Sequence, residues 1–186
     1  ITKSEAQISG YAGVSMALSS LKDAFATLQT KSGFSAVSVQ SSAPAAFSAI
    51  ASTSAVAANH SIQINALAQP QRGTLGPLAS TGLSGDLVFS VNGGTSVTIA
   101  AASTPALTVS AINSKANLGV TAQLVNTSSD TSNPVYQIVL TSTESGSRNS
   151  FTVSSTISNS SYTELNAAQD AELVVDGLTV NRSNNT

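Results

Sequence analysis

The chain has 186 residues, a formal net charge of −2 and only 9% charged residues, whereas Ser and Thr make up roughly thirty per cent of it. That length holds one medium domain or two small ones with a real hydrophobic core, and the few basic side chains exclude a stripe that could neutralise several phosphates. We therefore expect no nucleic-acid partner.

The chain contains no cysteine, which excludes a disulfide framework and a thiolate metal site. No apolar run approaches the roughly 18 residues of a membrane-spanning helix, so we expect no membrane insertion. The first residues also lack the order of a secretory signal peptide. Because the sequence begins within a helical pattern and stops soon after a strand pattern, we interpret it as a fragment.

Apolar side chains recur at alternating steps of three and four residues between Ile1 and Lys31, and Gly33 marks a stop. This spacing is a heptad stripe and predicts a helix. Ser and Thr occupy much of the other face, so the stripe favours packing on a partner helix over the core of an ordinary globular domain. The predicted packing residues are Tyr11, Val14, Leu18, Leu21, Phe25 and Leu28.

Residues 34–58 are mostly Ser, Ala, Val and Thr and predict an extended connection. The alternation from Ser61 to Leu67 predicts a half-buried strand. The Gly- and Pro-rich stretch from Pro70 to Gly85 predicts a loop. Two alternating runs between Asp86 and Ala100 flank Asn92-Gly93-Gly94, which is the strongest hairpin signal in the chain.

The second half of the chain begins with a predicted short amphipathic helix at residues 105–116. Its expected apolar face contains Leu107, Val109 or Ala111, Ile112 and Ala116. Strands are predicted at residues 119–126, 135–142 and 151–155, with a turn at 144–149. Residues 172–182 predict a second hairpin with Asp176-Gly177 at its tip.

These elements predict an α+β fold in which a coiled-coil-type helix precedes a mostly antiparallel β head with one short helix packed on the sheet. The expected divisions are a leg helix at 1–33, an extended connection at 34–58 and the head at 59–186. A subdomain inserted at about 72–162 is expected within the head, with the second hairpin returning to the sheet that begins at Ile62.

Two groups of polar residues invite a functional interpretation. His60 precedes Ser61, but adjacency in a Ser-rich chain does not make a triad, so we expect a polar position at a strand edge. Asp170, Glu172 and Asp176 fit no calcium loop, and Asp176 is explained by its turn. We predict no catalytic, cofactor-binding or metal-binding residue, and no enzyme activity.

The order of these elements is similar to the flagellin IN motif. The similar stretches are VNGG (91–94), LTVSAINSKAN (107–117), GVTAQLVN (119–126) and YQIVLTSTESGSRNSFTV (136–153). The flanking stretches resemble the filament cap family, hook-associated protein 2 (FliD): YAGVSMALSSLKDAFATLQ (11–29), INALAQPQ (64–71) and AAQDAELVVDGLTVNRSNNT (167–186). The stretch 71–83 has no counterpart in this resemblance.

This resemblance implies an extracellular cap at the tip of the bacterial flagellum. Members of the family form ring-shaped homo-oligomers, retain exported flagellin and promote its assembly, so flagellin and the hook-filament junction proteins are the implied partners. They pass through the flagellar export apparatus without a cleaved signal peptide, and no cofactor is implied. The stripe at Tyr11 to Leu28 would belong to a leg bundle.

Two other functions remain open at this stage. A hydroxyl-rich β head suits an adhesion module that binds host mucin or other glycans. A flagellin-type filament subunit can also carry an IN motif.

Overall fold

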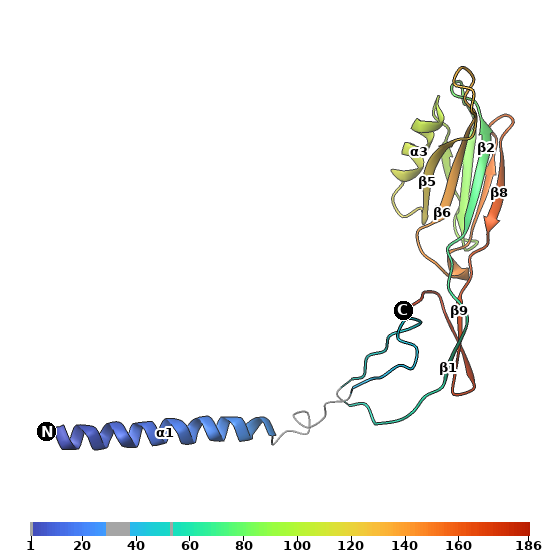
Figure 1. Cartoon of the computed structure of the whole chain (residues 1–186). Coiled ribbons are helices and arrows are strands. Elements are labelled where there is room, and N and C mark those ends of the chain that lie inside the picture. Colours follow the sequence, from blue (N-terminus) through green and yellow to red (C-terminus); the bar gives the residue numbers. More distant parts are fainter. Residues whose placement is uncertain (1, 29–37, 53) are drawn as a thin grey trace. The chain divides into compact units, whose positions relative to one another are not determined.

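The computed structural model describes residues 2–28, 38–52 and 54–186, which divide into a unit at 1–59 and a unit at 60–186 (Figure 1). One N-terminal helix is followed by antiparallel sheets and a short helix. This arrangement confirms the predicted α+β fold class.

The first unit contains helix α1, Thr2–Leu28. The predicted stop at Lys31 and Gly33 lies outside the described residues. Between residues 38 and 59, the described backbone forms turns in which the Ala46 and Ala55 N–H groups donate to the carbonyls of Ala43 and Ser52.

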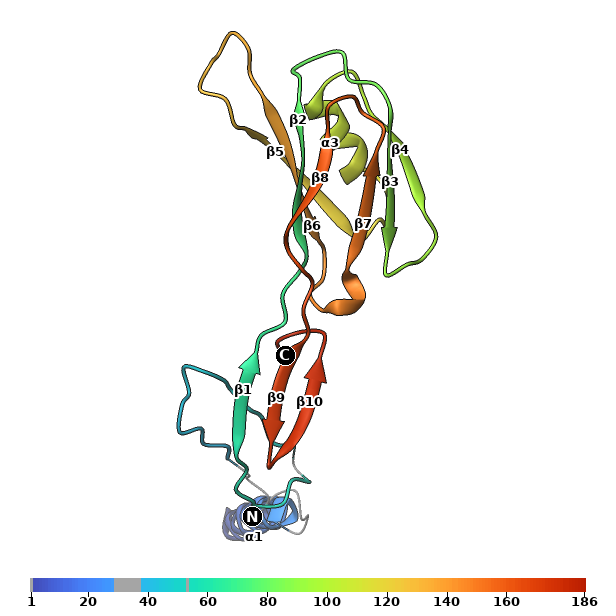
Figure 2. The ribbon, with the colours of Figure 1, turned by 90° about the vertical axis from the view of Figure 1, so that its right-hand side faces the viewer.

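The second unit begins and ends in one three-stranded antiparallel sheet, which we call the small sheet. Its strand order is β1-β9-β10. The bounds are β1 Ile62–Ala66, β9 Ala171–Val175 and β10 Leu178–Arg182. The first and last strands of the unit therefore belong to one sheet, and the residues between them build the rest of the unit (Figure 2).

Those intervening residues form two further antiparallel sheets. The four-stranded sheet has the order β5-β6-β2-β8, and the second has the order β4-β3-β7. The bounds are β2 Arg72–Leu78, β3 Asp86–Val91, β4 Val97–Ala100, β5 Val120–Asn126, β6 Tyr136–Ser142, β7 Phe151–Ser155 and β8 Ser161–Asn166. A short 3-10 helix, η1 Ser147–Asn149, precedes β7.

The two sheets meet across one apolar cluster, which is the core of the head. The cluster draws side chains from both sheets and from helix α3, Pro105–Asn113, which packs on β5 and β6 and also reaches β4. Its fully buried members are Leu75, Leu87, Phe89, Ile112, Ile138 and Leu140. Burying a side chain of this size stabilises the fold by about 1.5–3 kcal/mol relative to leaving it in water.

The two predicted hairpins are confirmed by their turn geometry. Asn92 and Gly93 have φ values of 50° and 66°, and the Gly94 N–H donates to the Val91 carbonyl over 2.8 Å. Asp176 and Gly177 have φ values of 51° and 85°. Positive φ at both central residues is what the favoured tight turn requires. In the β9–β10 hairpin these two residues form the whole loop, because Val175 pairs with Leu178, whereas the β3–β4 connection is longer, with Phe89 paired to Val97.

The prediction of a loop from Pro70 to Gly85 is wrong, because strand β2 occupies the first half of this stretch. The glycine at position 73 suits the strand because a Cβ there would come within 2.4 Å of the Tyr162 ring. The pairing with β6 is irregular between Leu75 and Leu78, around Gly76-Pro77. An irregularity of this kind accommodates a proline in a strand.

Strand β8 was not predicted, because its side chains carry almost no apolar alternation. Apart from the partly buried Tyr162, every residue of β8 is exposed. Its pairing with β2 is therefore set by backbone hydrogen bonds and by the tyrosine.

Helix α3 lies close to the prediction but ends at Asn113, and its buried face is rotated. Leu107, which was expected on the apolar face, is 54% exposed, whereas Thr108 is fully buried. The Thr108 hydroxyl is satisfied because it accepts from the Ala102 N–H and donates to the Thr104 carbonyl. Thr104 also caps the helix by accepting from the Leu107 N–H.

Three amide side chains bind the backbone of a distant strand or segment through both of their polar atoms. Gln71 donates to the Phe151 carbonyl over 2.8 Å and accepts from the Phe151 N–H over 2.7 Å. Asn113 does the same at Ala122, and Asn185 at Ala68. Each amide thus bonds the N–H and the carbonyl of one residue, as the backbone of a neighbouring strand would. We call these contacts the amide clamps.

The Gln71 clamp is the buried one, and it connects the residue just before β2 to β7 in the opposite sheet. Gln71 is 2% exposed, and its Nε2 also lies 2.9 Å from the Tyr162 hydroxyl. The Phe151 and Tyr162 rings lie beside it with centroids 5.8 Å apart. Burial raises the pKa of the Tyr162 phenol above its ordinary value of 10.0, and the Glu164 carboxylate acts in the same direction.

We predict that Gln71→Ala lowers the free energy of unfolding of the head by about 3 kcal/mol, because it leaves buried backbone groups of Phe151 without partners. Gln69→Ala is the control, since the Gln69 side chain is exposed and its loss is expected to change stability by less than about 0.5 kcal/mol. Denaturant unfolding followed by circular dichroism measures both. Equal stability of the two variants would contradict the clamp.

Candidate functional site

The predicted packing residues of α1 lie exposed along the helix. The described members of the stripe are Tyr11, Val14, Leu18, Leu21 and Phe25, and they are between 54% and 77% exposed. Leu28 lies within the helix, but its side chain is outside the described residues. The structure thus presents the stripe as a surface and leaves its expected packing role as a prediction.

His60 and Ser61 lie at the entry to the small sheet and meet the tip of the β9–β10 hairpin. His60 Nδ1 is 2.6 Å from Asp176 Oδ2, and the Ser61 N–H donates to Asp176 Oδ1 over 2.8 Å. The Asp176 N–H donates in turn to the Ser61 carbonyl. These bonds use the Ser61 backbone, so the three residues join the start of β1 to the hairpin tip.

Hydrogen bonding lowers the pKa of the Asp176 carboxyl below its ordinary value of 3.8. The largest cause is the bond with His60, followed by the bond from the Ser61 N–H. Both favour the ionised carboxylate. The pair is open to solvent, with 59% of the His60 side chain and 45% of the Asp176 side chain exposed.

The other two carboxylates highlighted by the sequence have different partners. Asp170 accepts from the Ser147 N–H over 2.7 Å and from the Ser147 hydroxyl over 2.8 Å. Glu172 accepts from the Asn65 amide over 2.8 Å. The structure therefore does not bring Asp170, Glu172 and Asp176 together at one ion. Within residues 2–28, 38–52 and 54–186, no group of three or more His, Cys, Asp or Glu side chains is arranged to hold a metal.

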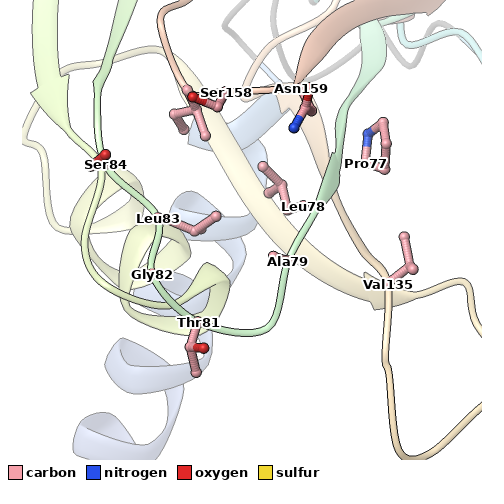
Figure 3. A pocket seen from close by; sticks show the side chains of 11 residues that line it. Pro77, Leu78, Ala79, Thr81, Gly82, Leu83, Ser84, Val135, Ser158 and Asn159 are labelled. Carbon is pink, nitrogen blue, oxygen red and sulfur yellow. The ribbon is translucent and has the colours of Figure 1, made fainter.

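A hollow of about 370 Å³ lies at the end of the head where β2 leads into β3 (Figure 3). Uncharged side chains line it, including the buried Leu78 and Ile157 and the half-buried Leu83. Such a lining offers apolar contact but no acid or base for chemistry. The remaining lining residues are Pro77, Ala79, Thr81, Gly82, Ser84, Val135, Ser158 and Asn159.

Along the described parts of the chain, no helix is both long enough and apolar enough to cross a lipid bilayer.

The sequence of the first unit and the start of the second matches a known family. The matching family model is described as the flagellar hook-associated protein 2 N-terminus, and it covers residues 1–71. A comparison with curated protein sequences finds no match.

Solved structures resemble the chain over a larger part of its length. The D2-D3 domains of the flagellar cap protein FliD from Escherichia coli align with a TM-score of 0.62 and 25% identity, over 75% of this chain and 81% of that one. FliD from Pseudomonas aeruginosa PAO1 aligns with a TM-score of 0.57 and 25% identity, over 71% of this chain and 69% of that one.

A longer structure, the D1-D2-D3 domains of FliD from Escherichia coli, aligns with a TM-score of 0.56 and 25% identity. The alignment covers 71% of this chain but only 44% of that one. The chain thus spans less than half of the three-domain relative.

We predict that the Asp170 carboxyl titrates below 3.8, because the hydroxyl of Ser147, and then its N–H, stabilise the ionised form. A carboxyl whose pKa is lowered by folding stabilises the folded state above its ordinary pKa, and this contribution disappears as the pH falls through the lowered value. Carbon-detected NMR titration of Asp170 measures the pKa directly.

Ser147→Ala should raise the pKa of Asp170 toward 3.8, whereas Ser158→Ala, in a different loop, should leave it unchanged. An Asp170 pKa that is the same in the unmodified chain and in Ser147→Ala would show that the hydroxyl does not stabilise the carboxylate.

Proposed function

This chain belongs to the flagellar hook-associated protein 2 (FliD) family, and we propose on that premise that it forms part of the cap at the distal tip of a bacterial flagellum. The observation that carries the proposal is the agreement of two separate comparisons. The family model matches residues 1–71, and the solved FliD structures align with about three quarters of the chain. The whole protein's partners and activity are inferred from that agreement.

In this proposal the protein is exported through the flagellar apparatus without a cleaved signal peptide and assembles into a homo-oligomeric ring outside the cell. The ring retains exported flagellin and promotes its addition to the filament, next to the hook-filament junction proteins. The cysteine-free sequence supports this route, because the chain can pass through a narrow channel unfolded without first breaking disulfides.

The head suits a scaffold because its polar contacts serve folding. Gln71, Asn113 and Asn185 hold backbone segments together, and His60 and Asp176 close the small sheet. We therefore propose a structural role without catalysis or a cofactor. The surface of the head, rich in Ser and Thr, is the part of the molecule that would face flagellin subunits.

We propose that α1 packs in a helical bundle through Tyr11, Val14, Leu18, Leu21, Phe25 and Leu28. A helix whose apolar side chains are left in water gains little stability from propensity alone. Gly10 and Gly13 lower that propensity further. A partner helix that covers the stripe would supply the missing burial, which amounts to roughly 1.5–3 kcal/mol for each large side chain.

The proposed cap function is tested by deleting the gene and comparing flagellin in the medium with filaments on the cells. We expect bare hooks and abundant monomeric flagellin in the medium, because subunits escape where no cap retains them. Restoring the gene should restore filaments. Filaments of normal length in the deletion strain would reject a cap role and favour an adhesin or a minor filament component.

The leg-bundle proposal is tested in the complementing gene with Leu18→Asp. A carboxylate in the stripe should reduce filament assembly at least tenfold, since burying it in a helical interface is unfavourable by more than about 1.4 kcal/mol. Met16→Asp is the matched control, because Met16 lies on the opposite side of the helix by the heptad spacing and is equally exposed. Immunoblots of exported protein confirm equal amounts.

Equal filament assembly in the Leu18→Asp and Met16→Asp strains would contradict the assigned stripe.

A further inference from the structure

The turn that follows β3 carries the one Asn-Gly pair of the sequence, Asn92-Gly93 (Figure 2). Asparagine is a chemically labile residue, because the backbone nitrogen of the next residue can attack its side-chain amide carbon. A following glycine favours this attack, since it has no Cβ to hinder the approach. The residues that form the turn are therefore also those with the highest intrinsic reactivity of this kind.

Both reacting groups are open in the folded head. Asn92 and Gly93 are exposed, and a Cβ built on Gly93 would meet no atom within 4 Å. Within the described parts of the chain, neither the Asn92 side chain nor the Gly93 N–H has a hydrogen-bond partner. The Asn92 N–H donates to the Ser150 carbonyl over 2.7 Å, and the Gly94 N–H to the Val91 carbonyl over 2.8 Å. The turn is thus held by its neighbouring groups, while the atoms that would react are free.

The other positive-φ residues of the described chain show which features are special to Asn92. Asn117 and Asn159 have φ values of 57° and 61°, close to the 50° of Asn92, and both are exposed. They are followed by a leucine and a serine, whose side chains hinder the approach of the backbone nitrogen. A similar backbone without the following glycine is therefore less reactive.

The tip of the β9–β10 hairpin has the glycine but not the free side chain. Asp176 has a φ of 51° and is followed by Gly177, yet both of its carboxylate oxygens are occupied. Oδ2 lies 2.6 Å from His60 Nδ1, and Oδ1 accepts from the Ser61 N–H over 2.8 Å. An ionised carboxylate offers no leaving group, and these two partners hold it in place. Only the turn at Asn92 combines an amide leaving group, an unbound side chain and a following glycine.

We propose that Asn92 is a site of spontaneous modification, which converts to aspartate and isoaspartate without an enzyme. The Gly93 nitrogen forms a bond to Cγ of Asn92, and the bond from Cγ to the amide nitrogen breaks. Ammonia leaves with the proton of the Gly93 N–H, and a five-membered succinimide ring remains.

Solvent water then opens this ring, and no other reactant is needed. Water adds to one of the two ring carbonyl carbons, the bond from that carbon to the Gly93 nitrogen breaks, and the nitrogen regains a proton. Opening at Cγ gives aspartate with the original backbone. Opening at the backbone carbonyl carbon of residue 92 gives isoaspartate, in which the chain continues through the former side chain.

Either product changes the head close to the Gln71 clamp. Each adds one negative charge to the stretch 91–96, which is otherwise uncharged. Isoaspartate also adds a backbone carbon within the ring that the bond from Gly94 to Val91 closes. Val91 pairs with Phe151, whose backbone is bound by Gln71. The protein thus accumulates with age a charge variant altered at this turn, whatever its role in the cell.

Peptide mapping by mass spectrometry tests this assignment in the complete gene product, incubated at neutral pH in water enriched in oxygen-18. A residue that converts during incubation gains one solvent oxygen, which distinguishes it from a residue converted beforehand. Chromatography separates the aspartyl and isoaspartyl peptides. Asn117 and Asn159 are internal controls with matched φ and exposure. A second portion, incubated in denaturant, reports on the unfolded chain.

We expect Asn92 in the folded protein to convert at least about tenfold faster than Asn117 or Asn159, because the following glycine lowers the barrier to ring closure. Both products should form, and Asp176 should yield no isoaspartate. Asn92→Asp keeps a turn of the Asp-Gly type and should abolish ammonia release at this position. Asn117→Asp makes the same charge change elsewhere and should leave the conversion of Asn92 unaltered.

Three results would overturn the assignment. Conversion of Asn92 at the rate of Asn117 and Asn159 would show that the following glycine gives no advantage in this turn. Conversion in denaturant alone would show that the folded turn prevents ring closure. Aspartate formed without isoaspartate would indicate direct hydrolysis of the amide instead of a succinimide.

Discussion

The Gln71 side chain is the contact on which the arrangement of the head depends, because it bonds the residue that leads into β2 to the first residue of β7 in the other sheet. Its amide pairs with both backbone groups of Phe151 and also meets the Tyr162 hydroxyl. A buried amide with unsatisfied atoms is costly, so these bonds favour the observed position of β7 relative to the start of β2. The glycine at position 73 belongs to the same unit, since any side chain there would displace the Tyr162 ring.

Hydrogen bonds from side-chain amides to the backbone recur in this chain, which has few charged residues and no disulfide. With 9% charged residues and no cysteine, the chain fixes its segments with neutral amides, as Asn113 does on β5 and Asn185 at Ala68. Two carboxylates, those of Asp170 and Asp176, hold backbone N–H groups at the ends of the small sheet. Neutral contacts of this kind are little affected by salt.

Much of the fold could be predicted because the core strands and both hairpins carry strong local signals. Asn92-Gly93 and Asp176-Gly177 need positive φ, and β6 alternates apolar and polar side chains. Strand β2 was missed because Gly73 and Pro77 normally interrupt strands, and only the distant Tyr162 explains the first of them. Thr108 replaces Leu107 in the core because its hydroxyl finds partners at Thr104 and Ala102, which spacing alone does not reveal. The amide clamps were missed for the same reason, since each joins residues that are far apart or on different elements.

Helix α1 was predicted from the spacing of its apolar residues, whereas the packing role of the stripe from Tyr11 to Leu28 stays a prediction. We propose that a β head with few charged residues and an amphipathic helix α1 are carried to the tip of the flagellum. Gold labelling of an epitope inserted in the exposed loop at 127–134, followed by electron microscopy of filaments, tests that claim most directly. The account predicts label only at the distal end of each filament. Label along the whole filament would identify a filament subunit instead, and label absent from flagella would contradict the account.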